Sequence, residues 1–357
     1  MGSLSTGESE IDMVRSDDSA DFKEDSTPTG AINWANILGL SSQTPKLSGE
    51  AIPSDDRFEI LALIGTGACS QVYKARQLHP SRVVALKVLH PHLLTNAEST
   101  ARFQREAESG ARLNHSSICT VYEYGRLSNG QPFIAMQYLE GESLASLLRR
   151  FECLDIEEAL PIFLSCCNAL IAAHEQGIVH RDIKPANIFI QSIGKERDAK
   201  LLDFGLAKVL SHSVPSLTQT GIALGTVQYM SPEQILSEPV DARSDIYSLG
   251  CVMFQTLTGR QVFEGRTAFE VMEEHINKLP ATLQSANPAA KIPSDLENVV
   301  LTALAKDPGR RYQSVEELRD ALASLSIEPE GHFFNQMVLY ALLVFSIFLL
   351  FFFFVRI

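Results

Sequence analysis

Two short stretches decide the fold of this chain of 357 residues: HRDIKPAN at residues 180–187 and LDFG at residues 202–205. The first follows a segment with a helical pattern and Gly177, and the second begins fifteen residues after Asn187. The polar and charged side chains within these stretches are His180, Arg181, Asp182, Lys184, Asn187 and Asp203. The candidate functional residues of the chain therefore centre on these two stretches.

A glycine-rich loop lies upstream of them. Residues 58–63 alternate like a strand, residues 65–72 read GTGACSQV, and residues 73–75 read YKA. Glycines let the backbone approach phosphate groups and donate N–H groups to them. A dinucleotide-binding fold would require a helix directly after such a loop. Because YKA is not the start of a helix, the sequence argues against that fold.

Lys87 stands inside the apolar run VVALKVL at residues 83–89. A lysine in a buried strand is costly unless it is paired. The candidate partner is Glu106, in the helical stretch at residues 101–113, which could orient Lys87 towards phosphate oxygens. Taken alone, Lys87 could equally be a lysine at the edge of a strand.

These motifs, in this order, resemble the eukaryotic-type serine/threonine protein kinases, in their bacterial sub-family. The resemblance rests on GTGACSQV, VALK, the helix glutamate, HRDIKPAN, DFG and the SPE at residues 231–233, and it covers residues 57–325. It implies an α+β, bilobal protein kinase fold. The expected N-lobe, at about residues 57–136, is small and β-rich with one main helix, and the expected C-lobe, at about 141–325, is large and helical.

The resemblance also implies roles for the charged residues. Lys87, held by Glu106, would contact the α- and β-phosphates of ATP. Asp203 and Asn187 would be the metal ligands, for Mg²⁺ or alternatively Mn²⁺. Phosphoryl transfer leaves the protein mainly positioning and charge compensation, and these residue types supply both.

Two residues of the HRDIKPAN stretch would act on the reacting groups, again by resemblance. Asp182 would accept or orient the proton of the attacking hydroxyl. Lys184 would reach the γ-phosphate, and a lysine at this position marks serine/threonine rather than tyrosine specificity.

An apolar slot for the nucleotide base is expected from the same resemblance. Met136 would be the gatekeeper, and the backbone of Gln137 and Leu139 would meet the adenine. The third glycine of the phosphate loop is replaced by Ser70. The residues expected at ATP are Ile64, Gly65, Thr66, Gly67, Ala68, Cys69, Ser70, Val72, Ala85, Lys87, Met136, Gln137, Leu139 and Phe189.

The Ser/Thr-rich segment between DFG and SPE resembles an activation loop. Thr218 and Thr220 are the predicted autophosphorylation sites, and Arg181 could bind a phosphate placed there. An unmodified polar loop is the alternative. By resemblance, Glu233 should pair with Arg311, and the helix that carries Asp245 and Gly250 should anchor the catalytic loop.

Charge and apolar residues are segregated along the chain. Residues 1–56 hold 3 basic and 11 acidic residues, a net −8 of the total −13, which leaves −5 for the rest. This segment is predicted to be a disordered leader and linker, within which residues 31–40 are either a docking motif or a spacer. An acidic chain lacks the clustered basic excess that nucleic acid needs, so nucleic acid is excluded as the main partner.

The other end of the chain is apolar. Residues 337–355 read MVLYALLVFSIFLLFFFFV, 19 residues without a charge, or ~28 Å as a helix against a hydrocarbon core of ~30 Å. We expect a transmembrane tail anchor here, after a juxtamembrane linker at residues 326–336. Because ATP and protein substrates are cytosolic, the kinase domain would face the cytoplasm, at a bacterial cell membrane.

The sequence thus predicts a membrane-anchored serine/threonine protein kinase. The expected partners are ATP, proteins with Ser or Thr, membrane lipid through residues 337–355, and a second copy bound through the kinase domain or the tail helix. A membrane-tethered pseudokinase scaffold is one alternative, although neither Lys87 nor Asp182, Asn187 or Asp203 is lost. A small-molecule phosphotransferase is the other, and the long loop before SPE argues against it.

Overall fold

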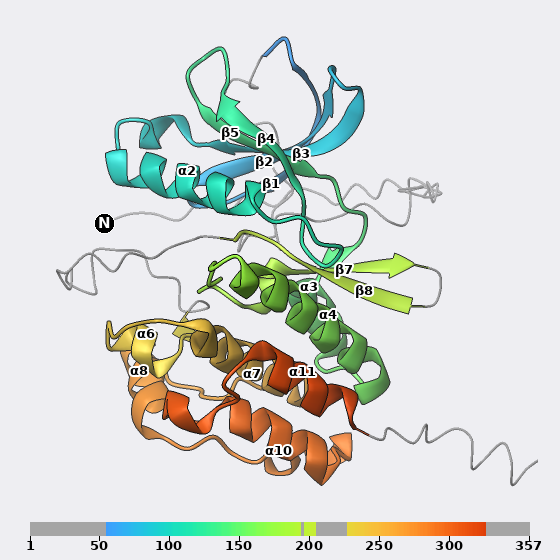
Figure 1. The fold of residues 1–357 in the computed structure, drawn as a ribbon, viewed down its shortest axis with the longest axis vertical. Helices are drawn as coiled ribbons and strands as arrows, with labels where there is room; N and C mark the ends of the chain where they lie inside the picture. Colours follow the sequence, from blue (N-terminus) through green and yellow to red (C-terminus); the bar gives the residue numbers. More distant parts are fainter. Residues whose placement is uncertain (1–54, 194–195, 205–226, 326–357) are drawn as a thin grey trace, which may run out of the picture. The chain divides into compact units, whose positions relative to one another are not determined.

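A computed structural model describes residues 55–193, 196–204 and 227–325, which form two lobes (Figure 1). Several predictions fall outside these residues and are not tested by the fold. They are the leader up to residue 54, the sites Thr218 and Thr220, the linker 326–336 and the span 337–355.

The N-terminal lobe is built on a five-stranded antiparallel sheet with the order β1-β2-β3-β5-β4. In chain order the strands are β1 (Phe58–Thr66), β2 (Ser70–Gln77), β3 (Arg82–Leu89), β4 (Val121–Arg126) and β5 (Pro132–Gln137). Thr66 pairs with Gln71, so the glycine-rich loop is a tight connection between neighbouring strands. Across β2 and β3, Val72 pairs with Lys87, which brings the loop and the lysine to the same end of the sheet.

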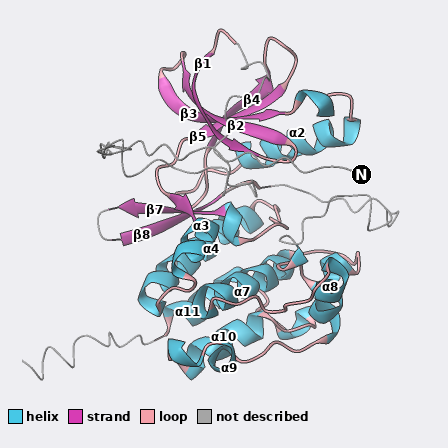
Figure 2. Ribbon diagram, turned by 180° about the vertical axis from the view of Figure 1, so that it is seen from behind, coloured by secondary structure: helices cyan, strands magenta, loops and turns pink. Residues whose placement is uncertain are grey.

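One long helix, α2 (Ala97–Ala111), packs on β4 and β5 (Figure 2). It begins four residues before the predicted start, at residue 101, because the side chain of Asn96 caps it by accepting from Ser99 N at 2.9 Å. Its buried residues follow the helical spacing: Phe103, Glu106, Ala107 and Gly110. A glutamate therefore lies on the buried face of α2, where it needs a partner.

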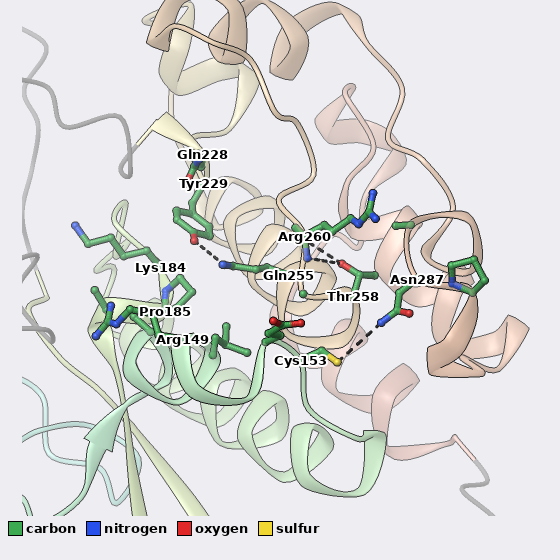
Figure 3. A pocket seen from close by; sticks show the side chains of 17 residues that line it. Arg149, Cys153, Lys184, Pro185, Gln228, Tyr229, Gln255, Thr258, Arg260 and Asn287 are labelled. Carbon is green, nitrogen blue, oxygen red and sulfur yellow. Dashed lines mark hydrogen bonds between the residues drawn. The ribbon is translucent and has the colours of Figure 1, made fainter.

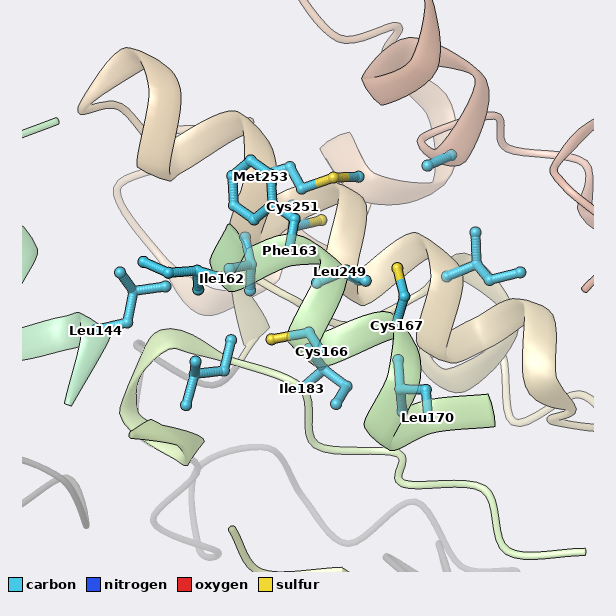
Figure 4. Close-up of a cluster of buried hydrophobic side chains, with 14 of the residues drawn as sticks. Leu144, Ile162, Phe163, Cys166, Cys167, Leu170, Ile183, Leu249, Cys251 and Met253 are labelled. Atoms are coloured by element: carbon cyan, nitrogen blue, oxygen red, sulfur yellow. The ribbon is translucent and has the colours of Figure 1, made fainter. Parts of the chain in front are cut away.

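The C-terminal lobe is helical. Its α-helices are α3 (Leu144–Phe151), α4 (Ile156–Glu175), α6 (Pro232–Ile235), α7 (Ala242–Thr258), α8 (Ala268–Asn277), α9 (Leu283–Ala286), α10 (Ser294–Ala303) and α11 (Val315–Ala323). Its short 3-10 turns are η2 (Pro185–Asn187), η3 (Pro288–Ala290) and η4 (Pro308–Arg310), and a further one, η1 (Pro91–Leu93), follows β3 in the N-terminal lobe. Figure 4 shows the centre of the core, where Phe163 and Cys166 of α4 meet Leu249 and Met253 of α7.

Helix α4 is, among the described residues, long and apolar enough to cross a membrane. It is nevertheless a core helix, because it packs against β8, α7 and α11. Its fully buried side chains include Ile162 and Leu170, which belong to the main hydrophobic core of the C-lobe. Length and apolarity alone thus do not separate a core helix from a membrane span.

A small three-stranded sheet, β6 (Glu142–Ser143), β7 (Ile188–Ile193) and β8 (Glu196–Leu201), lies next to the helices. Backbone hydrogen bonds of Leu201 join this sheet to the segment that precedes β4. Cys119 N donates to Leu201 O at 2.9 Å, and Leu201 N donates to Ser117 O at 2.8 Å. The HRDIKPAN stretch enters β7 and the LDFG stretch leaves β8, so this sheet places both motifs side by side.

The predicted ion pair of Glu233 with Arg311 is present in the C-lobe, and a close approach of α7 to α10, which was not predicted, lies near it. Arg311 pairs with Glu233 through two bonds, Nη1–Oε1 at 2.7 Å and Nη2–Oε2 at 2.9 Å. Gly250 lets α7 approach α10 closely, because a Cβ there would lie 3.1 Å from Ala303 Cβ. Both contacts brace the helices beneath the catalytic loop.

Candidate active site

Lys87 lies between two carboxylates. Its Nζ is 2.6 Å from Glu106 Oε1 and 3.1 Å from Asp203 Oδ1, and all three side chains are at most 8% exposed. The predicted pair with Glu106 is present, and the second contact, to Asp203, was not predicted. Contacts between segments so far apart in sequence leave no local pattern.

The three charges shift one another's pKa values. Burial alone would lower the pKa of Lys87, but the carboxylates of Asp203 and Glu106 outweigh it and raise that pKa above its usual value. Burial raises the pKa of Glu106 to about 7, a shift that Lys87 opposes. Burial would also raise the pKa of Asp203, yet Lys87 holds it below its usual value. Lys87 is therefore a fixed cation, and Asp203 a fixed anion.

Asp182 is held by its neighbours in the catalytic loop. Lys184 Nζ donates to Asp182 Oδ2 at 2.8 Å, and Asn187 Nδ2 donates to the same oxygen at 3.1 Å and to the Asp182 carbonyl at 2.8 Å. No described residue engages Oδ1. The carboxylate is thus oriented through one oxygen, and the other is left to accept a proton.

The backbone around these carboxylates is strained. Arg181 has φ 65° and Asp203 has φ 56°, values that residues other than glycine adopt at a cost. Asp245, on α7, compensates at the first position: its Oδ1 accepts from Arg181 N and its Oδ2 from His180 N, both at 2.8 Å. The predicted anchoring of the catalytic loop by the helix that carries Asp245 is confirmed.

The two motifs are joined directly. Leu202 N donates to the carbonyl of Asn187 at 2.9 Å, and the ring of His180 bonds the Leu202 carbonyl at 3.0 Å. The ring of His180 also packs edge-on against Phe204, at 4.6 Å between centroids. These contacts fix the segment that carries Asn187 against the segment that carries Asp203.

The donor set fits a metal that arrives with its substrate. Among the described residues there is no group of three or more His, Cys, Asp or Glu side chains that could hold an ion by itself. Mg²⁺ usually takes one or two protein oxygens together with substrate phosphates and water. Asp203 supplies a carboxylate, and Asn187, whose amide nitrogen is bonded to Asp182, keeps its amide oxygen for such a cation.

Several residues predicted for the base slot belong to one cluster of buried apolar side chains. Its members are Val72, Ala85, Cys119, Met136, Leu139, Phe189 and Leu202, with Ile64 packed against them. Both backbone polar groups of Gln137 have partners, since its N donates to Thr120 O at 2.8 Å and its carbonyl accepts from Cys119 Sγ at 3.7 Å. Cys119 and Leu202 also belong to this cluster but were not predicted from the sequence. Leu202 could have been found, because it directly precedes Asp203.

The glycine-rich loop is closed by its own backbone and by one histidine. Gly67 N donates to Ser70 O at 2.7 Å. His90, just after β3, donates from Nε2 to Gly67 O at 2.8 Å, and its backbone N donates to Cys69 O at 2.9 Å. Ser70, in place of the third glycine, is buried at the start of β2. His90 carried no signal in the sequence.

The protein kinase domain family matches residues 58–322, and the chain belongs to that family. The C-lobe and the β-sheet lobe described above are its two halves, and the lysine, HRDIKPAN and DFG motifs lie between them.

Its similarity to known proteins places the chain among the bacterial serine/threonine kinases. It is 41% identical to serine/threonine-protein kinase PknB of Mycolicibacterium smegmatis over 267 residues, which are 74% of this chain and 42% of that protein. It is 38% identical to the probable PknB of Corynebacterium glutamicum over 284 residues, 78% of this chain and 43% of that protein. The chain thus spans about two fifths of the length of these relatives.

A solved structure agrees. The crystal structure of the kinase domain of PknI from Mycobacterium tuberculosis superposes with a TM-score of 0.58 at 30% identity, covering 76% of this chain and 96% of that domain. The expected bilobal fold is therefore confirmed for the kinase domain.

Proposed function

We propose that this protein transfers the γ-phosphate of ATP to serine and threonine hydroxyls of proteins. The observation that carries the proposal is the pair of networks around Lys87 and Asp182, which the Leu202–Asn187 bond joins. One network offers a fixed cation and a metal-binding carboxylate. The other offers an oriented carboxylate with one open oxygen. Phosphoryl transfer needs these groups for positioning and charge compensation.

In the proposed mechanism Asp182 accepts the proton of the attacking hydroxyl at Oδ1, while Lys184 and Asn187 keep its other oxygen in place. Lys87, oriented by Glu106, binds the α- and β-phosphate oxygens. Asp203 and Asn187 hold Mg²⁺ or Mn²⁺, which would neutralise charge on the phosphates. The apolar slot around Val72, Ala85 and Phe189 binds the adenine.

An assay of substrate classes tests this function. The full chain, with ATP and Mg²⁺, should phosphorylate Ser and Thr peptides and leave Tyr peptides and small alcohols unmodified. Transfer to small alcohols alone would favour a small-molecule phosphotransferase, and ATP binding without transfer would favour a pseudokinase scaffold.

We also propose that residues 337–355 anchor the chain, with the kinase domain in the cytoplasm. The same activity should then sediment with the membrane fraction and become soluble when residues 337–357 are removed.

We further propose that the enzyme phosphorylates its own activation loop at Thr218 and Thr220. Arg181 supports this, because its Nε is buried and has no hydrogen-bond partner among the described residues. A buried guanidinium nitrogen without a partner is costly, and a phosphate oxygen would satisfy it.

Mass spectrometry after incubation with ATP checks the loop sites. Phosphate is expected on Thr218, Thr220 or both in the wild-type chain and on neither in Asp182→Asn incubated alone. An active wild-type preparation with both threonines unmodified would refute the proposal.

A further inference from the structure

A cavity of about 840 Å³ opens next to the catalytic loop (Figure 3). Its walls come from α3, from Lys184 and Pro185, from Gln228 and Tyr229, and from the end of α7 with the turn at Asn287. The cavity therefore touches the residue that orients Asp182, since Lys184 Nζ lies 2.8 Å from Asp182 Oδ2. A peptide whose hydroxyl lies at Asp182 would place its flanking side chains here.

The charged groups of this cavity are mostly cationic. They are Arg149, Lys184 and Arg260, against the single carboxylate of Glu152. Figure 3 shows Arg149 and Lys184 on one side of Gln255 and Arg260 on the other. Between them the lining is neutral and polar, with Tyr229 Oη donating to Gln255 at 2.6 Å.

The two arginines that line the cavity have no acidic partner among the described residues. Arg149 donates to the hydroxyl of Ser146 at 2.9 Å, and neither Arg149 nor Arg260 forms an ion pair with a carboxylate of the described residues. The neighbouring Arg150 behaves differently: it pairs with Glu142 at 2.6 Å and stacks on Phe151 at 4.7 Å. Guanidinium groups without an acidic partner, on both sides of a cavity, favour an anionic ligand.

The chain itself carries a segment of matching charge and chemistry. Its first 56 residues have a net charge of −8, from 3 basic and 11 acidic residues. Several serines there stand directly beside acids: Ser9 lies between Glu8 and Glu10, Ser16 precedes Asp17 and Asp18, and Ser26 follows Asp25.

We propose that the cavity binds the acidic side chains that flank a phosphorylated serine, and that the acidic leader is such a substrate of this kinase. The inference rests on the proposed protein kinase function and adds its substrate class. In each transfer the serine Oγ bonds to the γ-phosphorus and the bond from that phosphorus to the bridging oxygen breaks. ADP leaves with the electron pair, and the hydroxyl proton passes to Asp182 and then to solvent.

Peptide kinetics with the full-length enzyme test the recognition. The substrates are a peptide of residues 6–13, TGESEIDM, and its neutral counterpart with Glu8→Gln, Glu10→Gln and Asp12→Asn. The wild type should prefer the acidic peptide by about tenfold in kcat/KM, since exposed charge pairs are only modestly favourable. Raising the salt concentration should lower this ratio, because the arginines are exposed to solvent.

Substitution of the two cavity arginines tests whether the preference for the acidic peptide arises in the cavity. Arg149→Gln combined with Arg260→Gln should bring the ratio of the two peptides below about threefold, whereas the matched Arg150→Gln should leave the ratio as in the wild type. In the full chain, mass spectrometry should find phosphate on serines of residues 8–27, and less of it in the double variant.

The outcomes separate the two proposals. Transfer to both peptides at equal efficiency, or a preference that survives the double variant, would overturn the role of the cavity and leave the kinase function standing. An unphosphorylated leader in an active preparation would overturn the leader as the occupant. No transfer to any Ser or Thr peptide would overturn the kinase function itself.

Discussion

Replacing Asp182 with asparagine should lower kcat for peptide phosphorylation by about 10²- to 10⁴-fold, the usual contribution of a positioned general base. Asparagine keeps the size of the side chain and can still meet Lys184 and Asn187. It cannot take up the hydroxyl proton at the position that Oδ1 now occupies. KM for ATP should change little, because Lys87 and the apolar cluster that we propose for ATP are separate from Asp182.

Folding must be intact for this result to count. The side chain of Asp182 is only 12% exposed, but asparagine has the same size, so the thermal unfolding midpoint of the variant should stay close to that of the wild type. Asp198, on β8, offers a matched control, because its carboxylate accepts from Ser165 at 3.3 Å and has no place in the catalytic loop. Asp198→Asn should retain most of the activity. A fall of less than tenfold in Asp182→Asn would contradict the proposed mechanism.

Removal of Arg311 should cost about 3–5 kcal/mol of stability, the range found when one partner of a buried ion pair is deleted. The side chain of Arg311 is fully buried and that of Glu233 is 5% exposed. Besides this carboxylate, the guanidinium bonds the carbonyls of Ala305 at 2.7 Å and Arg243 at 2.9 Å. Arg311→Met would therefore leave a carboxylate buried without its counter-charge.

The pH dependence of that loss follows from Glu233. Burial acts to raise the pKa of its carboxyl, but bonds from Arg311 and Ser244 keep that pKa below its usual value. Without Arg311 the burial effect dominates, so the pKa in the folded variant should rise above that of the unfolded chain. Such a group destabilises the fold above the unfolded pKa, and the destabilisation fades as the pH falls towards 4–5.

Urea denaturation at pH 7 and at pH 5 measures both effects. The double variant Glu233→Gln with Arg311→Met should be more stable than Arg311→Met, because the stranded charge is gone. The adjacent Arg310, with a side chain 83% exposed, gives the control, and Arg310→Met should stay within about 0.5 kcal/mol of wild type. A loss below about 1 kcal/mol in Arg311→Met would refute the bracing role of this pair.

The membrane prediction shows that hydropathy alone does not identify a membrane-spanning helix. Helix α4 and residues 337–355 are both long and apolar, yet α4 lies in the core of the C-lobe. The packing of α4 against β8, α7 and α11 identifies it as a core helix, and hydropathy does not measure such packing. The tail anchor stays a prediction, because residues 337–355 lie outside the described structure.

The sequence alone determined the class of protein and the charged residues of its site. HRDIKPAN, DFG and the lysine strand are local patterns, and their chemistry requires particular residue types at short spacing. The pair Lys87–Glu106 was predictable because a charge in an apolar strand demands a partner, and the pair Glu233–Arg311 was predictable from the family resemblance. The structure confirmed both pairs.

Only the tertiary structure decided the rest. It placed Asp203 beside Lys87, His90 on the glycine-rich loop, Cys119 in the base slot, and Arg149 across a cavity from Arg260. These contacts join segments that are distant along the chain, and many apolar or charged side chains could have filled each place. Which one does so depends on how strands and helices pack, and packing distances are not written in residue spacing.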